Sequence, residues 1–106
     1  MAKFLGIWRI NGTALPSDPV EQVQAIEMVF AQIDDALKSG QLTEFGFFPS
    51  GSSGYAIMSG ETTDAFGAAI SFFPWMESEV HEMISYETGK EITKEVLKVQ
   101  MEAMKR

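Results

Sequence analysis

The sequence contains no cysteine, one histidine, and fewer basic than acidic residues, with 8 Lys and Arg against 15 Asp and Glu. The absence of cysteine excludes disulfides, thiol catalysis, iron–sulfur clusters and cysteine-ligated zinc, and it is typical of a reducing cytosol. The formal net charge of −7 repels phosphate backbones and anionic lipid surfaces. We therefore expect no nucleic-acid partner and no membrane partner.

Long hydrophobic runs are also missing. No window holds the about 18 successive apolar residues of a membrane span, and the densest stretch, residues 66–76, is interrupted by Ser71 and Pro74. The chain begins MAKFLGIW, where no apolar segment precedes a small-residue cleavage site and Arg9 follows at once. These features predict a cytoplasmic protein without an export signal.

The composition is that of one globular domain spanning residues 1–106. The chain is 45% hydrophobic and 11% aromatic, and its 106 residues match the usual size of a single domain. A chain of this length buries only about 60–65% of its unfolded surface on folding. A second copy that covers further apolar area would therefore stabilise it.

Hydrophobic periodicity and turn residues predict seven elements in the chain. The predicted strands span residues 3–10, 42–48, 55–59 and 76–86, and the predicted helices span 19–39, 62–73 and 89–106. The expected helix caps are Asp18 with Glu21 in a capping box, Thr62 or Thr63, and Thr88. Phe73 closes the apolar stripe of the second helix before Pro74 ends it.

The element order is that of a ferredoxin-like βαββαβ core at residues 3–86 with an added C-terminal helix, an α+β fold with a four-stranded antiparallel sheet. Both core helices then cover one face of the sheet and leave the other bare. The strands nevertheless carry apolar residues on both faces. In the first strand, for example, Phe4 and Trp8 point to one face, and Leu5 and Ile7 point to the other. A bare face of this kind predicts a two-fold homodimer with the open sheet faces packed together.

The sequence also resembles a known group of proteins. The chain resembles the dimeric α/β-barrel superfamily, and its small stand-alone domains in particular. The resemblance lies in the element order, the aromatic first strand, the segment GYAIMSGE at residues 54–61 and the run FPW at 73–75 leading to ESEVH at 77–81. The resemblance covers residues 3–86. It implies the dimeric barrel; the superfamily includes cofactor-independent quinone-forming monooxygenases, muconolactone isomerases, haem-degrading enzymes and stress-response domains. It shares no catalytic motif, so no residue role carries over.

His81, the single histidine, is the first candidate for chemistry. Its alternation places it beside Glu79, and an imidazole near a carboxylate can act as a general base, orient a polar ligand or bind a metal or haem. The alternative is a hydrogen-bonded, partly exposed strand residue. Glu77 and Glu79 share its face, so a metal site of one histidine and two carboxylates is conceivable but less favoured. We predict no metal and no cofactor.

Arg9 and Glu44 are the charged candidates on the other strands. In the expected sheet the end of the first strand lies near the start of the fourth, so Arg9 either pairs with Glu77 or Glu79 or holds a ligand carboxylate or enolate oxygen. Glu44 is either an acid in a cavity or a charge that discourages unwanted pairing at a sheet edge.

Aromatic and methionine side chains supply enough apolar surface to line a pocket, although core packing explains most of them. Trp8, Tyr55 and Tyr86 are of particular interest because each carries a polar atom that needs a partner when buried. On the last helix, Met101 and Met104 suggest a docking face for a partner subunit.

Two hypotheses follow. In the first, an apolar cleft between sheet and helices binds a small aromatic or quinone-like molecule for proton abstraction, isomerisation or cofactor-free oxygenation. The residues assigned to it are His81 as acid or base, Arg9 and Tyr86 as oxygen-positioning groups, and Trp8, Tyr55, Trp75 and Glu79 as ligand-binding groups. In the second, the domain is a non-enzymatic interaction or ligand-sensing module. A pocket lined by His81 and Arg9 favours the first, and an outer-surface position for both favours the second.

Overall fold

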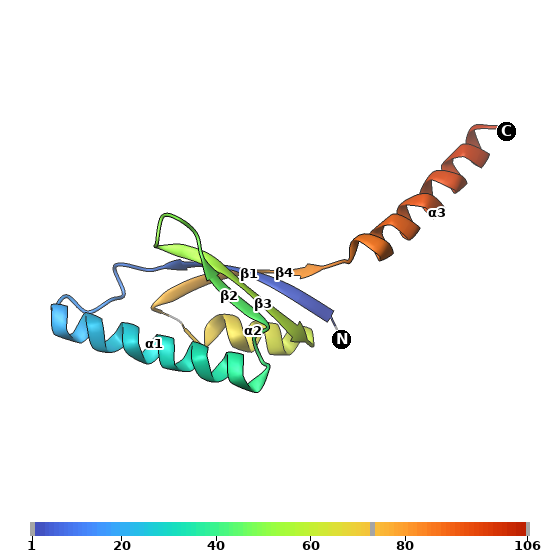
Figure 1. Ribbon diagram of the computed structural model, residues 1–106. Coiled ribbons are helices and arrows are strands. Elements are labelled where there is room, and N and C mark those ends of the chain that lie inside the picture. The colour runs from blue at the N-terminus through green and yellow to red at the C-terminus, as the bar shows by residue number, and fades with distance from the viewer. Residues whose placement is uncertain (1, 73, 106) are drawn as a thin grey trace.

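The structure, a computed structural model, describes residues 2–72 and 74–105. The elements in chain order are β1 (Ala2–Ile10), α1 (Pro19–Ser39), β2 (Glu44–Phe47), β3 (Ser53–Gly60), α2 (Thr62–Ile70), β4 (Met76–Met83) and α3 (Tyr86–Met104) (Figure 1). The expected α+β class with a four-stranded antiparallel sheet is confirmed.

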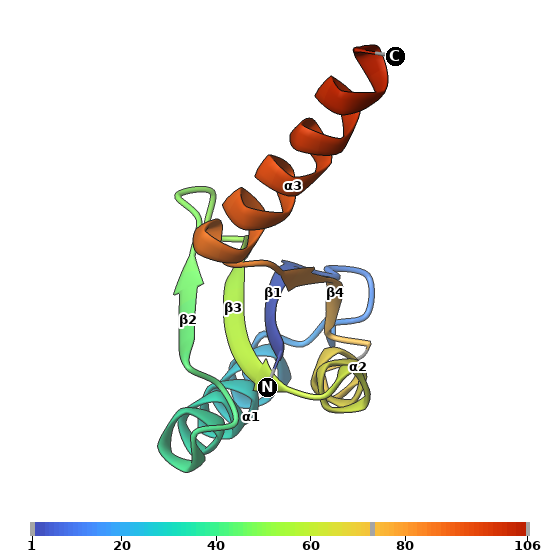
Figure 2. The ribbon, with the colours of Figure 1, turned by 90° about the vertical axis from the view of Figure 1, so that its right-hand side faces the viewer.

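The strand order is β2-β3-β1-β4, which is compatible with a ferredoxin-like fold (Figure 2). β4 lies beside β1, as the sequence predicts, and Arg9 is in register with Glu77. The ribbon shows α1 and α2 on one side of the sheet, whereas α3 leaves on the other side (Figure 1). One face of the sheet is therefore covered by helices and the other is open.

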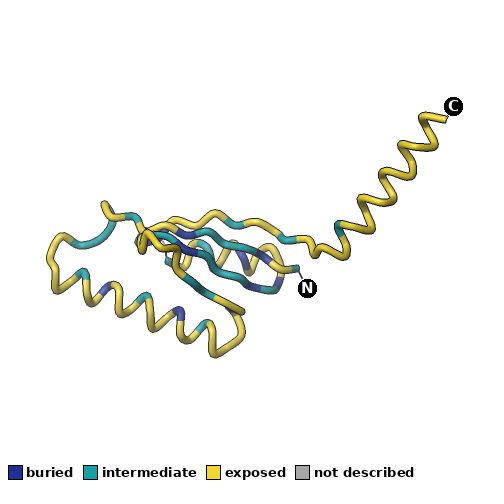
Figure 3. Tube along the Cα trace, turned by 45° about the horizontal axis from the view of Figure 1, so that its top comes forward, coloured by how far each residue is buried: buried dark blue, intermediate teal, exposed yellow. Residues whose placement is uncertain are grey.

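The core lies between the sheet and the two helices that cover it. Side chains of a strand point alternately to its two faces, and Phe4 and Trp8 of β1 are buried on the helix side. The buried core cluster consists of Phe4, Ile33, Leu42, Met58 and Ala65. Figure 3 shows the buried stretches of the chain on the strands and helices of the body, whereas α3 has none. The uncovered face carries the odd-numbered residues of β1.

Helix α1 begins and ends where the sequence predicts. Pro19 occupies the first turn, where its missing N–H has no intrahelical partner to lose, and Gly40 closes the helix with a left-handed φ of 83°. The predicted capping box is not formed, because the side chain of Asp18 makes no capping hydrogen bond. Beyond the helix, the Leu42 N–H donates to the Ala36 carbonyl at 3.1 Å, which brings Leu42 into the core.

Helix α2 is capped one residue earlier than predicted. Glu61, not Thr62 or Thr63, is the N-cap residue, and the Asp64 carboxylate accepts a hydrogen bond from the Glu61 N–H at 3.0 Å. The helix ends at Ile70, and Phe73, which the sequence places on the apolar stripe of this helix, lies outside the described residues.

The junction between β4 and α3 differs most from the prediction. β4 ends at Met83, and Ser85, not Thr88, caps α3, since the Ser85 hydroxyl accepts a hydrogen bond from the Thr88 N–H at 3.2 Å. The short polar side chain of Ser85 offers a capping oxygen at the usual spacing, so the helix starts at Tyr86 instead of residue 89. Tyr86 therefore belongs to a helix and not to the fourth strand.

The predicted hairpin strands are also shifted at their ends. β2 is limited to Glu44–Phe47, because Leu42 before it turns inward to the core. β3 extends over Ser53–Gly60, because β1 pairs with it along the whole of β3. None of the helices in residues 2–72 and 74–105 is both long and apolar enough to cross a bilayer.

Two glycines allow aromatic rings to lie flat across the sheet. On the helix side, a Cβ at Gly54 would meet the Gly46 carbonyl oxygen and the Trp8 indole. On the open side, a Cβ at Gly46 would meet the Tyr55 ring, whose Cζ would be 2.7 Å away. A glycine in a strand often marks such a close approach. The two glycines thus allow the Trp8 ring of β1 and the Tyr55 ring of β3 to lie flat on opposite faces of the β2–β3 hairpin.

We expect Gly54→Ala to destabilise the protein by about 1–3 kcal/mol, because one of the atoms it meets is backbone and cannot move aside. Gly12→Ala is the matched control, since no atom lies within 4 Å of its new Cβ. Urea unfolding of the two variants measures the difference. Equal unfolding free energies for both would show that the Trp8 packing across β3 is not as tight as described.

Candidate functional site

An apolar cavity of about 230 Å³ lies between α1 and the helix-side face of the sheet. Its walls come from β1, the loop before α1, α1 itself, β2 and the segment that enters β4. The aromatic lining residues are Trp8, Phe30, Phe45, Phe47 and Trp75, and the main aliphatic ones are Leu15, Ala25, Ile26, Val29 and Ile33. Ala25, a small residue buried on α1, is part of this lining.

The floor of this aromatic cavity is a cluster of mutually oriented rings. Trp8 stacks on Phe45 with ring centroids 5.3 Å apart and an interplanar angle of 8°. Phe47 is edge-to-face with Trp8, with ring centroids 5.4 Å apart, and Phe30 of α1 is edge-to-face with Phe47 at a centroid distance of 6.4 Å. Offset-stacked and edge-to-face rings at these distances are the favoured aromatic geometries. The cavity therefore presents flat, ordered π surfaces from both the sheet and α1.

The chemistry available inside the cavity is narrow. None of the lining residues that the structure describes carries an ionisable side chain. The Trp8 indole N–H donates to the Tyr55 carbonyl oxygen at 3.3 Å, so this donor is already engaged. Such a lining can bind a neutral apolar molecule by burial and stacking, whereas it offers no group for proton transfer.

No protein-family model matches this sequence, and no curated protein matches it.

The open face of the sheet carries a second group of candidate residues. Its centre consists of half-buried Leu5, Ile7, Tyr55 and Ile57. Around this centre the exposed charged and polar side chains are Lys3, Arg9, Glu44, Glu77, Glu79 and His81. An apolar centre with a polar rim is the usual anatomy of a protein–protein interface.

His81 and Glu79 lie together on this open face. The His81 Nε2 is 3.5 Å from Glu79 Oε1, with just over half of each side chain exposed. Arg9 is not beside His81, because His81 is in register with Leu5, four residues from Arg9, or about 13 Å along the strand. Within the described part of the chain Arg9 forms no ion pair, so the alternative of a pair with Glu77 is not realised in this protomer.

A metal centre at these residues has no support from the structure. Residues 2–72 and 74–105 contain no cluster of three or more His, Asp or Glu side chains arranged to hold a metal ion. In this protomer the side chains of His81, Glu77 and Glu79 are therefore not gathered into such a cluster.

Tyr55 and Glu44 form a contact that the sequence reasoning missed. The Tyr55 hydroxyl donates a hydrogen bond to the Glu44 carboxylate from the neighbouring strand, reaching it across Gly46. This hydrogen bond, with smaller contributions from burial and from the negative charge, raises the pKa of Tyr55 above its ordinary value of 10.0. The signal in the sequence is Gly46, two positions after Glu44, because a residue without a side chain leaves room for the Tyr55 ring to cross the strand.

We expect Glu44→Gln to lower the pKa of Tyr55 toward 10.0, because the neutral amide no longer disfavours the phenolate. A raised folded-state pKa stabilises the fold below pH 10, and this contribution is lost as pH rises through the folded-state pKa. Ultraviolet titration of the phenolate in a Tyr86→Phe background measures the shift. An unchanged titration curve in Glu44→Gln would exclude the hydrogen bond.

Tyr86 stands apart from every other candidate. As the first residue of α3 it is 75% exposed, and its ring faces the Lys90 ammonium at 5.7 Å. The structure thus brings Trp8 and Trp75 together in the cavity and places His81, Glu79, Arg9 and Tyr55 on the opposite side of the sheet. The expected single cleft that contains all of them does not form within one protomer.

The cavity residues that the sequence reasoning missed come from α1 and its preceding loop. Phe30 and Ile26 belong to a helical stripe with a spacing of three and four, which by itself indicates a packed core. The one available signal was Ala25, a small residue beside that stripe. A small side chain opposite several aromatic rings leaves unfilled volume.

Proposed function

We propose that this protein binds a small, neutral, planar aromatic molecule in the aromatic cavity. The observation that carries the proposal is the pair of tryptophans, Trp8 and Trp75, in a lining without charged side chains. The Trp8 indole N–H is already hydrogen-bonded to the Tyr55 carbonyl oxygen. Burial of a flat apolar ring against such surfaces is favourable by about 25 cal/mol per Å² of apolar area, and stacking adds to it.

The size of the cavity limits the ligand. Its 230 Å³ is below the roughly 300–1,000 Å³ of pockets that hold drug-sized molecules, so one- or two-ring compounds fit and larger polycyclic ones do not. A charged ligand is disfavoured because its charge would lose water without gaining a partner. Uncharged quinones and phenols with one or two rings are the ligand class that we propose.

The binding or ligand-sensing function is favoured over catalysis by the position of the ionisable groups. His81 and Arg9 lie on the outer surface of the sheet, where the second hypothesis expects them, and Tyr86 lies on α3. Their catalytic roles stay predictions that would require a second copy or a ligand on the open face. The cavity itself would bind and release its ligand unchanged.

We also propose that two copies pair through the open face in the manner of a dimeric α/β-barrel, in the cytoplasm. Leu5, Ile7 and Ile57 would form the centre of this interface. Arg9 of each copy would be able to meet glutamates of the other, because a two-fold axis brings the same charged rim onto itself. The uncovered apolar centre supports this pairing.

Fluorescence titration of the protein with naphthoquinone tests the proposed function. Both tryptophans of the chain line the cavity, so their emission should be quenched saturably at one ligand per chain. The absence of cysteine removes the thiol addition that quinones usually undergo. Linear quenching without saturation, equal to that of free tryptophan amide, would contradict specific binding. Glucose is the polar control ligand and should leave the emission unchanged.

A further inference from the structure

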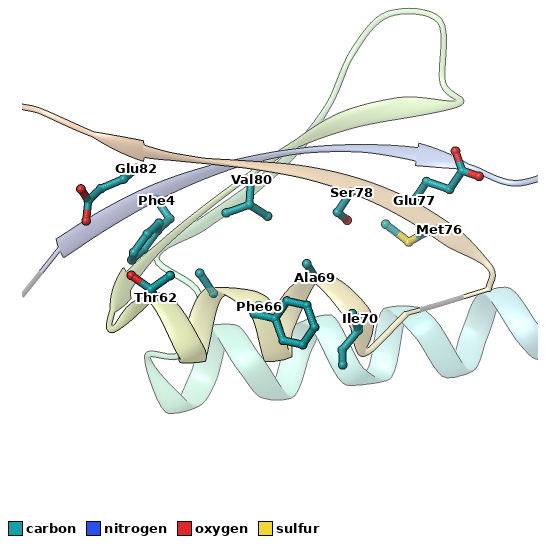
Figure 4. A pocket seen from close by; sticks show the side chains of 11 residues that line it. Phe4, Thr62, Phe66, Ala69, Ile70, Met76, Glu77, Ser78, Val80 and Glu82 are labelled. Carbon is teal, nitrogen blue, oxygen red and sulfur yellow. The ribbon is translucent and has the colours of Figure 1, made fainter.

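Two further hollows adjoin the aromatic cavity on the helix side of the sheet. A small chamber of about 50 Å³ lies between α2 and the sheet, and it shares Trp8, Phe45 and Met76 with the aromatic cavity. A groove of about 600 Å³ lies between α2 and β4, with Phe66 and Ile70 of α2 among its walls (Figure 4). The aromatic cavity is therefore the first of three neighbouring spaces.

One side chain separates these spaces from one another. Among the residues that the structure describes, Met76 alone lines all three. It is thus the single described residue that the aromatic cavity and the α2–β4 groove have in common. Met76 is buried, and Figure 4 shows its side chain at the end of the groove where β4 begins. Its thioether forms the wall between the proposed ligand site and the groove beyond.

The backbone of this wall is held in place from three directions. The Met76 N–H donates to the Phe72 carbonyl at 3.0 Å, and Met76 is in register with Ile10 of β1. The Asn11 N–H donates to the carbonyl of the preceding residue, Trp75, at 2.8 Å. The methionine side chain itself is unbranched and has three rotatable bonds. The place of the wall is therefore fixed by the backbone, whereas its extent is set by the side chain.

The other two residues shared by the cavity and the small chamber are held more rigidly. Trp8 and Phe45 stack on each other at 5.3 Å, and the Trp8 ring lies against Gly54. The Trp8 indole N–H is bonded to the Tyr55 carbonyl oxygen. Both rings lie on the sheet, so a change in either would alter the floor of the site. Met76 is the boundary that one substitution can move without disturbing the stacked rings.

We propose that Met76 determines how large a ligand the aromatic cavity accepts. This inference rests on the proposed binding of a planar aromatic molecule in that cavity. A ligand of two fused rings ends against the Met76 thioether, where a contact between sulfur and an aromatic ring is favourable. A third fused ring overlaps with this side chain. The groove behind Met76 has apolar walls and more volume than the cavity, so it has room for such a ring once the thioether is removed.

Fluorescence titration of the variant Met76→Ala with anthraquinone, the analogue of naphthoquinone with one more ring, tests this role. The wild-type protein should bind naphthoquinone at least about tenfold more tightly than anthraquinone, the range in which pockets discriminate by size. Met76→Ala should bind anthraquinone at least about tenfold more tightly than the wild-type protein does. Its affinity for naphthoquinone should fall, because the sulfur contact is lost.

Met58→Ala is the matched control. Met58 and Met76 are equally buried, with exposed fractions of 6% and 7%, so both variants lose the same core volume. Met58 lines the small chamber but neither the aromatic cavity nor the groove. Met58→Ala should therefore keep the wild-type preference for naphthoquinone. An equal gain of anthraquinone affinity in Met58→Ala, or no gain in a folded Met76→Ala, would contradict the role of Met76.

A phenylalanine at position 69 tests where the third ring lies. Ala69 of α2 lines both the groove and the small chamber but not the aromatic cavity. In the double variant Met76→Ala/Ala69→Phe, the added phenyl group should fill the space behind residue 76 and remove the gain in anthraquinone affinity. The single variant Ala69→Phe should bind naphthoquinone as the wild-type protein does. A gain that persists in the double variant would contradict entry of the third ring into the groove.

The wild-type protein provides a test that does not depend on any variant being folded. With methyl-labelled methionine, the Met76 methyl signal should shift with the same saturation curve as the tryptophan quenching by naphthoquinone, because a bound ring lies against it. The Met58 methyl signal should stay in place. A Met76 signal that does not move at saturation would overturn the inference and leave the proposed function intact. Absence of naphthoquinone binding would overturn both.

Discussion

Replacing Ala25 by phenylalanine is expected to abolish naphthoquinone binding while the protein stays folded. Ala25 is buried on the inner side of α1 and faces the aromatic floor of the cavity, so a phenyl ring at this position fills the space that the ligand would take. We expect the apparent Kd to rise at least about 100-fold, which corresponds to about 2.7 kcal/mol of lost binding free energy. Fluorescence titration measures this loss.

The matched control is Ala31→Phe on the same helix. Ala31 is exposed and does not line the cavity, so this variant adds the same group to α1 without occupying the site. It should bind naphthoquinone as the wild-type protein does. If Ala25→Phe binds as well as Ala31→Phe, the ligand site is not the aromatic cavity.

Ile7→Lys is expected to convert the dimer into a monomer. Ile7 lies at the centre of the open face, between Tyr55 and Glu79 of the neighbouring strands. In a monomer the ammonium can remain in water beside Glu79, but in a face-to-face dimer it would be buried near its symmetry mate. We expect the dimer dissociation constant to rise at least about 100-fold, measured by sedimentation equilibrium.

Val23→Lys serves as the control for this prediction. Val23 is exposed on α1, on the helix-covered side of the molecule, and its replacement makes the same change of charge. It should leave the dimer intact. A dimer that persists in Ile7→Lys but not in Val23→Lys would place the interface on the helices instead of the open face.

Much of the sheet could be predicted because its signals are local. The alternation of Met76 and Val80 against Glu79 and His81 fixed the two faces of β4, and the element order placed β4 beside β1. The start of α3 could not be predicted in the same way. Both Ser85 and Thr88 are good capping residues. Which of them caps α3 depends on where β4 ends, and in the structure the Ser85 hydroxyl accepts the hydrogen bond from the Thr88 N–H.

The candidate site was predicted only in part, for a physical reason. Parity along a strand shows that Trp8 and Arg9 point to opposite faces, but it does not show which face the helices cover. The expected pairing of Arg9 with Glu77 or Glu79 places His81 on the Arg9 face, so parity separates His81 from Trp8, whereas the choice of the covered face depends on how the helices pack. The contact between Tyr55 and Glu44 depends in addition on strand register, which joins residues eleven positions apart.

The most direct test of the ligand site uses the two tryptophans, since they give two indole N–H signals in a nitrogen–proton correlation spectrum of the labelled protein. Trp8 and Trp75 both line the aromatic cavity, and no tryptophan lies elsewhere in the chain. We predict that both signals shift with the same saturation curve as naphthoquinone is added, and that neither shifts in Ala25→Phe. Indole signals that stay in place at saturating naphthoquinone, or that shift equally in Ala25→Phe, would contradict a ligand site in this cavity.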